Sequence, residues 1–382
     1  MSPSARKIRV LTIGKYLPPP YAGIEAHIED LHLAARTDCD FSLIASRQRS
    51  HPMPQPRPYP IRLVRAYGQL ASLPIAPGYL VETLRALVRG DVDILHAHTP
   101  NPWGDLAVLL ARIFRIPTVI TWHSDIVQQR RLMKIYRPIQ LMALLAADRI
   151  VVPTPAHFKS SSQLAHRQLA SKIRVVPLGI NGDFLRHITP EPLAPELEAA
   201  IGGFSVVFAL GRHVPYKGFE YLVEATADLV PGAILVLGSD GPLTDDYRQR
   251  ARALGISHRL LITGKLSMGQ LVGLYRRCSV FCLPSVTRAE AFGIATAEAM
   301  CFGKPSVVTE LGNGVNFLNR DGSTCLTVPP RDPAALGAAL NRLLSDPALR
   351  DRLGLEAESW VANEFSIARM HEAILSVYRE LA

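Results

Sequence analysis

The sequence lacks a long uninterrupted apolar run. The best candidate, residues 139–147, carries Gln140 and stops at Asp148, whereas a membrane span needs roughly 18 residues. Cysteine is also scarce: five residues without framework spacing predict reduced, mostly buried thiols in a cytoplasmic protein. No Gly-x-Gly-x-x-Gly run occurs, which argues against a Rossmann dehydrogenase. Zinc-finger spacing and RNA-binding aromatic motifs are missing too, so we expect no nucleic-acid partner.

The composition is that of a globular protein with two domains. Hydrophobic residues make up 48% and charged residues 20% of the chain, which argues against disorder or a fibre. At roughly 150 residues per domain, 382 residues suggest two domains. Residues 7–14 are typical of a β-strand that begins with charged residues and not of a signal peptide, which also favours a cytoplasmic location of the protein.

Charge is divided unevenly between the halves. Residues 1–190 hold 24 Lys and Arg against 12 Asp and Glu, a net charge of +12, whereas residues 191–382 hold 18 against 21, a net charge of −3. Such asymmetry indicates that the first half faces something anionic, such as a nucleic acid, a membrane surface or phosphate. The alternative is that the excess only aids solubility.

Short apolar runs alternate with amphipathic stretches along both halves, which predicts an α/β fold with parallel sheets covered on both faces. The expected strands lie at 8–13, 41–45, 94–96, 118–121, 150–152, 173–176, 206–210, 234–237, 260–262, 280–283 and 306–308. The expected helices lie at 24–35, 80–89, 104–114, 131–146, 156–170, 218–229, 244–254, 268–277, 293–302 and 367–381.

A proline-rich stretch divides the pattern. Residues 188–203 contain three prolines and end in Gly-Gly, which is typical of a linker. We therefore expect an N-terminal domain over 1–187 and a C-terminal domain over 204–366. The last segment, 367–382, could cap either half, for instance by packing back on the N-terminal domain. A cleft between the two Rossmann-like domains is the default ligand site.

Three loops follow expected strands and carry residues suited to an anionic ligand. Gly23 opens a helix, where backbone N–H groups can approach a phosphate. Arg212 can bind a diphosphate through two hydrogen bonds of its guanidinium, and Lys217 adds the compact charge of its ammonium. Glu290 and Glu298, eight positions apart around Phe-Gly, are best explained as acceptors for sugar hydroxyls. Each loop alone is a weak signal, since turns, solvated cations and helix caps share these residues.

The combination is more informative than any part. In order along about residues 8–375, the motifs resemble those of the retaining glycosyltransferases of family 4 (group 1), which have a GT-B fold. They are Gly23-Ile-Glu25, His96-Ala-His98, Thr121-Trp-His123, Arg212…Lys217-Gly218, Gly238-Ser-Asp-Gly241-Pro242 and Glu290-x7-Glu298. Three positions depart from the family pattern. The chain has Ala22-Gly23 where Gly-Gly is usual, and Gly238-Ser-Asp-Gly241 where a Glu-Gly pair is commoner. His213 follows Arg212 where an aliphatic residue is more usual.

The resemblance implies a nucleotide-sugar donor held mainly by the C-terminal domain and an acceptor held mainly by the N-terminal one. Arg212 and Lys217 would neutralise the diphosphate, with backbone help from Gly23. Glu298 would accept hydrogen bonds from the ribose hydroxyls. Preplaced cations suit this chemistry because the leaving diphosphate gains negative charge in the transition state.

The resemblance also implies the residues around the donor sugar. Glu290 and the N–H groups of Phe292 and Gly293 would hold its hydroxyls, with Ile294 beside them. His123 would lie near the 6-hydroxyl and the anomeric carbon, so His123 and Glu290 are the candidate catalytic residues. In the usual proposal the acceptor attacks from the face that the diphosphate leaves, and a phosphate oxygen takes its proton. Stereochemistry would be retained without a protein nucleophile.

We expect no metal and no cofactor. Asp91-Val-Asp93 precedes a strand far from the donor loops and is interpreted as a polar turn, and Cys278-x3-Cys282 has no second pair to complete a zinc site. His96 and His98 are expected to point to opposite faces of their strand, so that at most one faces the cleft.

A basic and apolar segment follows at 128–138. Its cations Arg130, Arg131, Lys134 and Arg137 stand beside apolar residues, which suits an anionic membrane surface, although an ordinary solvated helix face has the same composition. We hypothesise a polyprenyl-diphosphate-linked acceptor on the inner face of the cytoplasmic membrane, where the protein would be peripheral.

The donor sugar is predicted by likeness alone. Residues 122–127 and 314–324 look most like those of bacterial O-antigen and exopolysaccharide mannosyltransferases, which use GDP-mannose. The alternatives are a UDP-sugar-dependent transferase, a sugar-nucleotide epimerase of GT-B shape, and an inactive membrane-attached scaffold.

Overall fold

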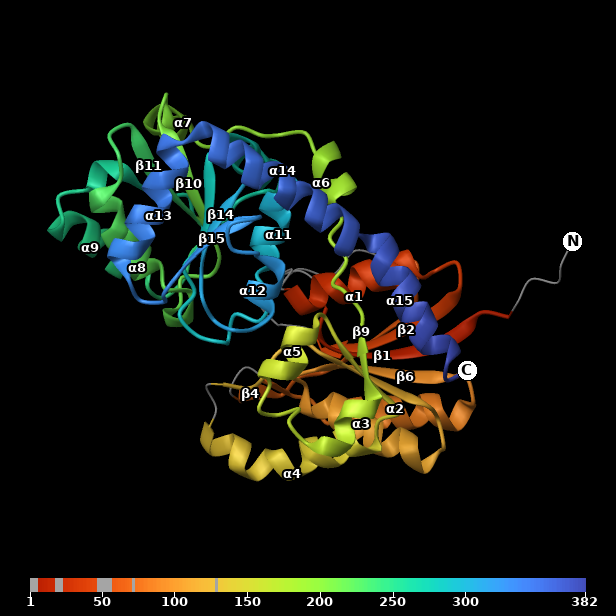
Figure 1. Cartoon of the computed structure of the whole chain (residues 1–382). Helices are drawn as coiled ribbons and strands as arrows, with labels where there is room; N and C mark the ends of the chain where they lie inside the picture. The colour runs from red at the N-terminus through yellow and green to blue at the C-terminus, as the bar shows by residue number, and fades with distance from the viewer. Residues whose placement is uncertain (1–5, 18–22, 47–56, 71–72, 128–129) are drawn as a thin grey trace, which may run out of the picture. The chain divides into compact units, whose positions relative to one another are not determined.

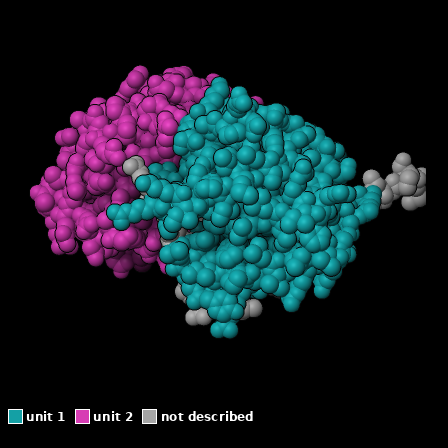
Figure 2. Space-filling view, turned by 90° about the horizontal axis from the view of Figure 1, so that it is seen from below, with its two compact units in different colours: residues 1–179, 367–382 teal, residues 180–366 magenta. Residues whose placement is uncertain are grey.

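The computed structural model describes residues 6–17, 23–46, 57–70, 73–127 and 130–382. They form two compact units, coloured separately in Figure 2. Unit 1 comprises residues 1–179 and 367–382, and unit 2 comprises residues 180–366. Among the described residues, no helix is long and apolar enough to cross a bilayer.

The predicted boundary at residue 187 differs from this division. Residues 180–187 belong to unit 2 because Arg186 donates a hydrogen bond to the carbonyl of Cys301 (3.1 Å) and accepts one from Arg276 at its own carbonyl (2.7 Å). The expected linker 188–203 is likewise part of unit 2, since it contains a helix at Pro195–Ile201 whose Ile201 is fully buried in that unit's core.

Unit 1 is built on a parallel sheet with the strand order β3-β2-β1-β6-β7-β8-β9. Its strands are β1 (Ile8–Tyr16), β2 (Cys39–Ser46), β3 (Ile61–Val64), β6 (Ile94–Thr99), β7 (Thr118–Trp122), β8 (Arg149–Val152) and β9 (Ile173–Val175). A small antiparallel hairpin pairs β4 (Gly68–Leu70) with β5 (Leu73–Ile75). The order reverses between β1 and β6, and such switch points are where open α/β sheets bind ligands.

Helices cover both faces of this sheet (Figure 1). They are α1 (Gly23–Ala34), α2 (Gly78–Arg89), α3 (Pro102–Ile113), α4 (Arg130–Ala146), α5 (Pro155–Ser160), η1 (Arg167–Lys172) and α15 (Ile367–Arg379). Successive strand residues point to opposite faces of the sheet. Leu11 belongs to the core under α2, α3 and α4. Val10 packs on the other face with Leu31 of α1 and Tyr378 of α15. The central strands β6 and β7 are buried along their whole length, although His96, His98 and Thr121 stand among their apolar residues.

Unit 2 repeats the plan with the order β12-β11-β10-β13-β14-β15, and its switch point lies between β10 and β13. Its strands are β10 (Ser205–Leu210), β11 (Ala233–Gly238), β12 (Leu260–Ile262), β13 (Val280–Leu283), β14 (Ser306–Thr309) and β15 (Cys325–Val328). Its helices are α6 (Gly182–His187), α7 (Pro195–Ile201), η2 (Pro215–Lys217), α8 (Phe219–Ala225), η3 (Thr226–Asp228), α9 (Thr244–Ala253), η4 (Ser257–Arg259), α10 (Met268–Arg277), α11 (Ile294–Met300), α12 (Gly314–Leu318), α13 (Pro333–Ser345) and α14 (Pro347–Glu364).

The α/β prediction with two parallel Rossmann-like halves is confirmed, but details differ. The single helix expected over 156–170 is wrong: α5 ends at Ser160 because Ser161 is extended, and η1 begins only at Arg167. The strands β3 and β15 were not predicted.

Candidate donor and sugar site

The loops after β10 and β13 meet through an ion pair. The Lys217 ammonium lies 2.6 Å from Oε2 of Glu290, and both side chains are nearly buried, with exposed fractions of 12% and 11%. Burial lowers the pKa of Lys217, but the nearby Glu290 carboxylate and Tyr216 outweigh it, so the pKa is raised overall. The pair therefore fixes a permanent cation at the switch point of unit 2.

Glu290 is held from two further directions. Ser285 donates its hydroxyl to Oε2 of Glu290 (3.0 Å), and Asn313 donates its side-chain amide to the backbone carbonyl of Glu290 (2.6 Å). Ser285 follows β13 and Asn313 follows β14, so the ends of adjacent strands position this carboxylate. Hydrogen bonds of this kind hold the side chain in one orientation, as recognition of a sugar hydroxyl requires.

Glu298 lies on α11 against a buried tyrosine. The Tyr275 hydroxyl donates to Oε2 of Glu298 at 2.6 Å. Burial raises the pKa of Glu298, and the hydroxyl partly opposes that rise. The carboxylate thus has a fixed partner on one of its two oxygens.

Two glycines bring the backbone close at this site. Gly218 has φ +67°, and a Cβ there would lie 2.2 Å from the carbonyl oxygen of Pro284, so only glycine lets the β10 loop approach the β13 loop. Gly293 has φ +84° and precedes α11. Phe292 turns its ring into the protein, 5.3 Å from the ring of Phe365, which leaves its backbone as the part suited to a ligand. Ile294 is half-buried.

Arg212 and His213 have opposite surroundings. Arg212 is exposed, and among the described residues no carboxylate pairs with its guanidinium, so it is available for an anion. His213 is fully buried: its Nδ1 lies 2.7 Å from the Thr244 hydroxyl, and burial lowers its pKa. A backbone bond from His213 N–H to the Asp240 carbonyl joins this loop to the one after β11.

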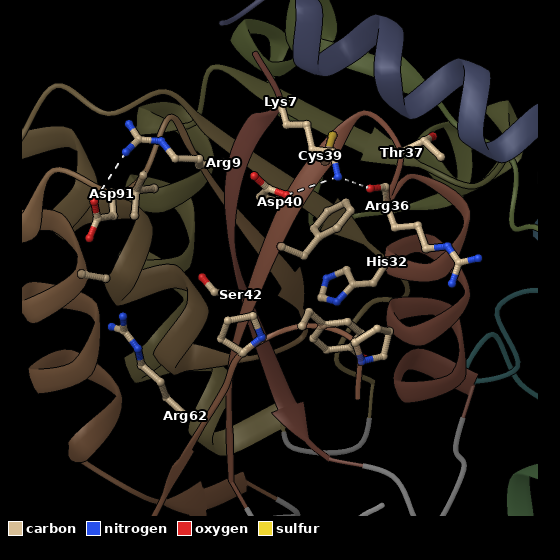
Figure 3. A pocket seen from close by; sticks show the side chains of 16 residues that line it. Lys7, Arg9, His32, Arg36, Thr37, Cys39, Asp40, Ser42, Arg62 and Asp91 are labelled. Carbon is tan, nitrogen blue, oxygen red and sulfur yellow. Dashed lines mark hydrogen bonds and ion pairs between the residues drawn. The ribbon is translucent and has the colours of Figure 1, made fainter. Parts of the chain in front are cut away.

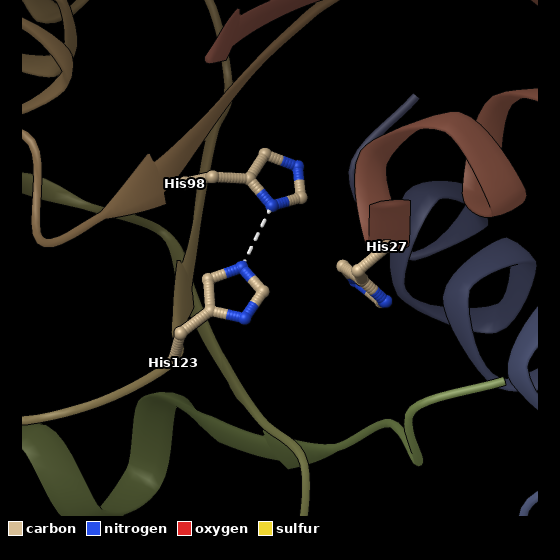
Figure 4. Close-up of side chains that lie close together, drawn as sticks. All are labelled: His27, His98 and His123. Atoms are coloured by element: carbon tan, nitrogen blue, oxygen red, sulfur yellow. Dashed lines mark hydrogen bonds between the residues drawn. The ribbon is translucent and has the colours of Figure 1, made fainter. Parts of the chain in front are cut away.

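Three histidines gather at the carboxyl-end side of the unit 1 sheet. His98 is near the end of β6, His123 follows β7, and His27 faces them from α1 (Figure 4). His98 Nδ1 lies 3.0 Å from His123 Nε2, and all three rings are buried. Burial lowers the pKa of His27 to about 4 and those of His98 and His123 well below the usual value, so the rings are neutral at pH 7.

The hydrogen bond between His98 and His123 restricts their tautomers. If His98 Nδ1 accepted, its Nε2 would carry a proton, yet among the described residues Nε2 has no partner. A buried unpaired N–H is costly, so the favoured arrangement has His98 Nδ1–H donating to His123 Nε2. His123 then carries its proton on Nδ1 and can donate it to a ligand oxygen.

The expected opposite orientation of His96 and His98 is wrong. Residues two apart on a strand share a face, and the two ring centroids lie 4.4 Å apart. Both rings are buried. His96 is fully hydrogen-bonded, with Tyr378 and Thr121 hydroxyls each 2.7 Å from a ring nitrogen, so it is a satisfied core residue.

The loop before α1 is described only in part, because residues 18–22 lie outside the described residues. Gly23 itself is exposed at the first position of α1. Glu25 is buried on the same helix; burial raises its pKa, and the charge of Lys15 opposes the rise.

The basic segment forms the start of α4. Arg131 and Lys134 are exposed, and the Arg130 side chain lies outside the described part. Arg137 does not join them: its guanidinium donates to Gln140 Oε1 and to the Gln163 carbonyl, both at 2.6 Å, and burial lowers its pKa. The prediction that Arg137 faces a membrane is therefore withdrawn.

A further pocket of unit 1 lies at the other edge of its sheet (Figure 3). Lys7, Arg9, Arg36 and Arg62 line it, and Asp40 and Asp91 lie 3.5 Å from Lys7 and Arg9 respectively. The residues at the starts of β1 and β2 contribute to it, so it opens at the amino ends of the strands. Open α/β sheets bind ligands at the opposite edge, so we do not assign it to the donor.

The sequence analysis missed the supporting residues Tyr275, Asn313 and His27. Asn313 follows the end of β14, a position that could have suggested it. Tyr275 gave no local signal, because only the packing of α10 against the sheet brings it to Glu298.

Comparisons with known proteins identify the family of the chain. Residues 198–360 match the family model of glycosyl transferases group 1, and residues 21–184 match that of glycosyltransferase family 4. The chain is 31% identical over 380 residues to the O-antigen chain mannosyltransferase C of Escherichia coli, covering 98% of this chain and 99% of that protein. It is 34% identical over 272 residues to the D-rhamnosyltransferase WbpZ of Pseudomonas aeruginosa, covering 70% and 68%.

A solved structure shows the same fold. The crystal structure of Anabaena HepE in complex with UDP matches with a TM-score of 0.76 and 18% identity, covering 98% of this chain and 100% of that one. The family predicted from the motifs is confirmed by these relatives. The chain belongs to the group 1 glycosyltransferases of family 4, with their GT-B fold.

Proposed function

We propose that the protein is a retaining glycosyltransferase that transfers mannose from GDP-mannose to a lipid-linked glycan during synthesis of a bacterial surface polysaccharide. The observation that supports this proposal is the contact between Lys217 and Glu290, whose ammonium and carboxylate oxygen lie 2.6 Å apart at the switch point of unit 2. A diphosphate joined to a sugar needs these two groups side by side.

In this proposal the unit 2 residues divide the donor between them. Arg212 and Lys217 stabilise the charge that develops on the leaving diphosphate, with the backbone of Gly23 of unit 1 assisting. Glu298, held by Tyr275, accepts from the ribose. Glu290 and the N–H groups of Phe292 and Gly293, next to Ile294, hold the sugar.

His123 supplies the remaining contact. Its neutral ring donates from Nδ1 to a hydroxyl of the donor sugar, and His98 keeps it in that tautomer. The diphosphate oxygen takes the acceptor proton, so the reaction needs neither a protein nucleophile nor a metal, and the anomeric configuration is retained.

The choice of mannose follows the E. coli relative, which is named an O-antigen chain mannosyltransferase and aligns over almost the whole chain. A UDP-sugar is the second candidate, since the HepE structure is a complex with UDP. The first test is thermal stability with excess GDP, UDP, ADP and dTDP, for the wild type and for Glu298→Ala. A nucleotide at about 100 times its dissociation constant stabilises by about 2.7 kcal/mol.

Each outcome has a different meaning. A shift with GDP alone that Glu298→Ala weakens supports the proposal, and transfer from GDP-mannose with NMR of the product's anomeric signal then tests retention. A shift with UDP alone overturns the mannose assignment. Release of free nucleotide without an acceptor would indicate an epimerase. No shift with any nucleotide would favour the inactive scaffold.

We further propose that α4 of unit 1 places the protein on the anionic inner face of the cytoplasmic membrane, next to a polyprenyl-diphosphate-linked acceptor. Exposed apolar residues recur along α4 at intervals of three and four, which puts them on one stripe: Leu132, Ile135, Ile139 and Met142. Arg131 and Lys134 are exposed beside them. An apolar stripe bordered by cations suits an interface with anionic lipids.

The test is sedimentation with liposomes that contain anionic lipid. Arg131→Gln together with Lys134→Gln should weaken binding, whereas Arg137→Gln should not do so beyond any loss of stability. Equal binding by the wild type and the double variant would contradict the membrane proposal and leave the donor chemistry untouched.

A further inference from the structure

The histidine cluster of unit 1 has the geometry of a cation site. One ring nitrogen from each of His27, His98 and His123 lies within 4.8 Å of the other two. The three side chains come from separate elements and converge on one space (Figure 4). The ring centroids are 5.2 to 5.7 Å apart.

Two nitrogens in the cluster have unused hydrogen-bonding capacity. His27 Nδ1 and His98 Nε2 are buried, and among the described residues neither has a hydrogen-bond partner. Leaving such a group unsatisfied costs about 1–3 kcal/mol. His96, directly beside the cluster, has both nitrogens satisfied and shows the ordinary arrangement of a core histidine.

We propose that His27, His98 and His123 bind a zinc-class divalent cation through one ring nitrogen each. Neutral imidazole is a good ligand for Zn²⁺ and Co²⁺, whereas Mg²⁺ and Ca²⁺ prefer oxygen ligands. Zinc–nitrogen bonds of about 2.0–2.1 Å in a tetrahedral site bring ligand nitrogens to about 3.3 Å from one another. One ring nitrogen from each histidine already lies within 4.8 Å of the other two, so ring rotations can bring the three nitrogens to that spacing.

Three protein ligands leave the fourth position of a tetrahedral ion open.

Binding has a consequence for activity that rests on the proposed function. His123 is the residue proposed to contact the donor sugar, and a cation on its Nε2 would replace the hydrogen bond from His98 that orients the ring for that contact. Zinc is therefore expected to inhibit transfer and to act as a reversible ligand of the site. Cation binding itself is measured without any substrate, so its failure and the failure of the proposed function are distinguishable.

The experiment uses tag-free protein that has been stripped with EDTA and then titrated with ZnCl2 by calorimetry at pH 7.5. Titration with Co²⁺, followed by visible absorption, reports nitrogen ligation directly. The wild type should bind one zinc per chain. His27→Gln should weaken binding by more than about tenfold, the loss seen even when a partner of a ligand is removed.

His32→Gln is the matched control. His32 lies on the same helix, is also buried, and also has an Nδ1 without a partner among the described residues, but it is not one of the three. It should leave zinc affinity unchanged. If His27→Gln fails to fold, His98→Gln replaces it.

Three results would overturn the inference: no zinc bound by the wild type, equal affinity in wild type and His27→Gln, or equal loss in His27→Gln and His32→Gln. In the first case the three rings form a metal-free hydrogen-bonded cluster.

Discussion

The Lys217 ammonium and the Glu290 carboxylate are 2.6 Å apart and nearly buried, so each neutralises the other where two loops of unit 2 meet. A ligand diphosphate would have to compete with Glu290 for that ammonium. The ion pair therefore links the strength of donor binding to the position of the carboxylate.

A double-mutant cycle tests this link. Lys217→Met and Glu290→Gln should each lower the free energy of unfolding by about 1–3 kcal/mol, because each leaves a charged group without its partner. The double variant should lose less than the sum, since the two residues are coupled. Urea unfolding measures all four proteins, and strictly additive losses would contradict the coupling.

The same variants separate binding from transfer. Glu290→Gln removes the internal competitor of Lys217, so its affinity for a nucleoside diphosphate should be equal to or higher than that of the wild type, while sugar transfer falls. Lys217→Met should lose both. Calorimetry with GDP and UDP is the measurement, and a lower affinity in Glu290→Gln would show that the carboxylate supports the diphosphate site directly.

Tyr275→Phe tests the hydroxyl that holds Glu298. Burial raises the pKa of Glu298 and the Tyr275 hydroxyl opposes that rise, so its removal should raise the pKa further. More of the carboxyl is then protonated at a given pH, so nucleotide affinity should fall most in acid and recover as the pH rises. The effect should be about 1.5–3 kcal/mol, as for hydrogen bonds to charged groups.

Tyr247→Phe is the control for that variant. Tyr247 is another buried tyrosine of unit 2, but its hydroxyl has no hydrogen-bond partner among the described residues. Its removal should change neither the affinity nor its pH dependence. Equal effects of the two substitutions would argue against a specific role for Tyr275.

The contrast between Glu298 and Tyr275 also shows what sequence can predict. Glu298 stands in a local motif, eight positions after Glu290, so it could be identified without coordinates. Tyr275 is 23 residues away on another helix, and only packing makes it a partner. The alternation of apolar runs predicted both sheets, because strands buried on two faces consist mainly of apolar residues.

The errors have equally local causes. Residues 156–170 contain enough helix formers to predict one helix, but Ser161 takes an extended conformation and its hydroxyl instead donates to Asp125. The linker prediction for 188–203 was wrong because one of its three prolines, Pro195, begins α7, a position where proline is favoured. Composition could not show that Arg131 is exposed and Arg137 is not, because that difference depends on where each residue lies around the axis of α4.

The buried histidines of unit 1 predict strong acid sensitivity. Burial lowers the pKa of His27 to about 4 and of His32 and His96 to about 3. The unfolded chain binds protons near pH 6.5 that the folded chain excludes. The stabilisation is therefore complete above pH 6.5 and is lost as the pH falls towards 4, by up to about 1.4 kcal/mol per pH unit for each histidine.

Urea unfolding at pH 7.5, 6 and 5 measures that slope. His32→Gln should reduce it by about one proton. A wild-type stability that does not fall between pH 7.5 and 5 would show that these rings are protonated in the folded protein.

Ile135 tests the apolar stripe of α4 without disturbing the fold. Its side chain is 78% exposed, so Ile135→Glu should change the free energy of unfolding by less than about 0.5 kcal/mol. The substitution replaces an apolar side chain of the stripe with a negative charge, so binding to anionic liposomes should fall sharply. Leu355→Glu is the matched control, because Leu355 is 69% exposed on α14 of unit 2. Equal loss in both variants would indicate that net charge, and not α4, governs binding, whereas loss in Ile135→Glu alone would assign the membrane contact to this helix.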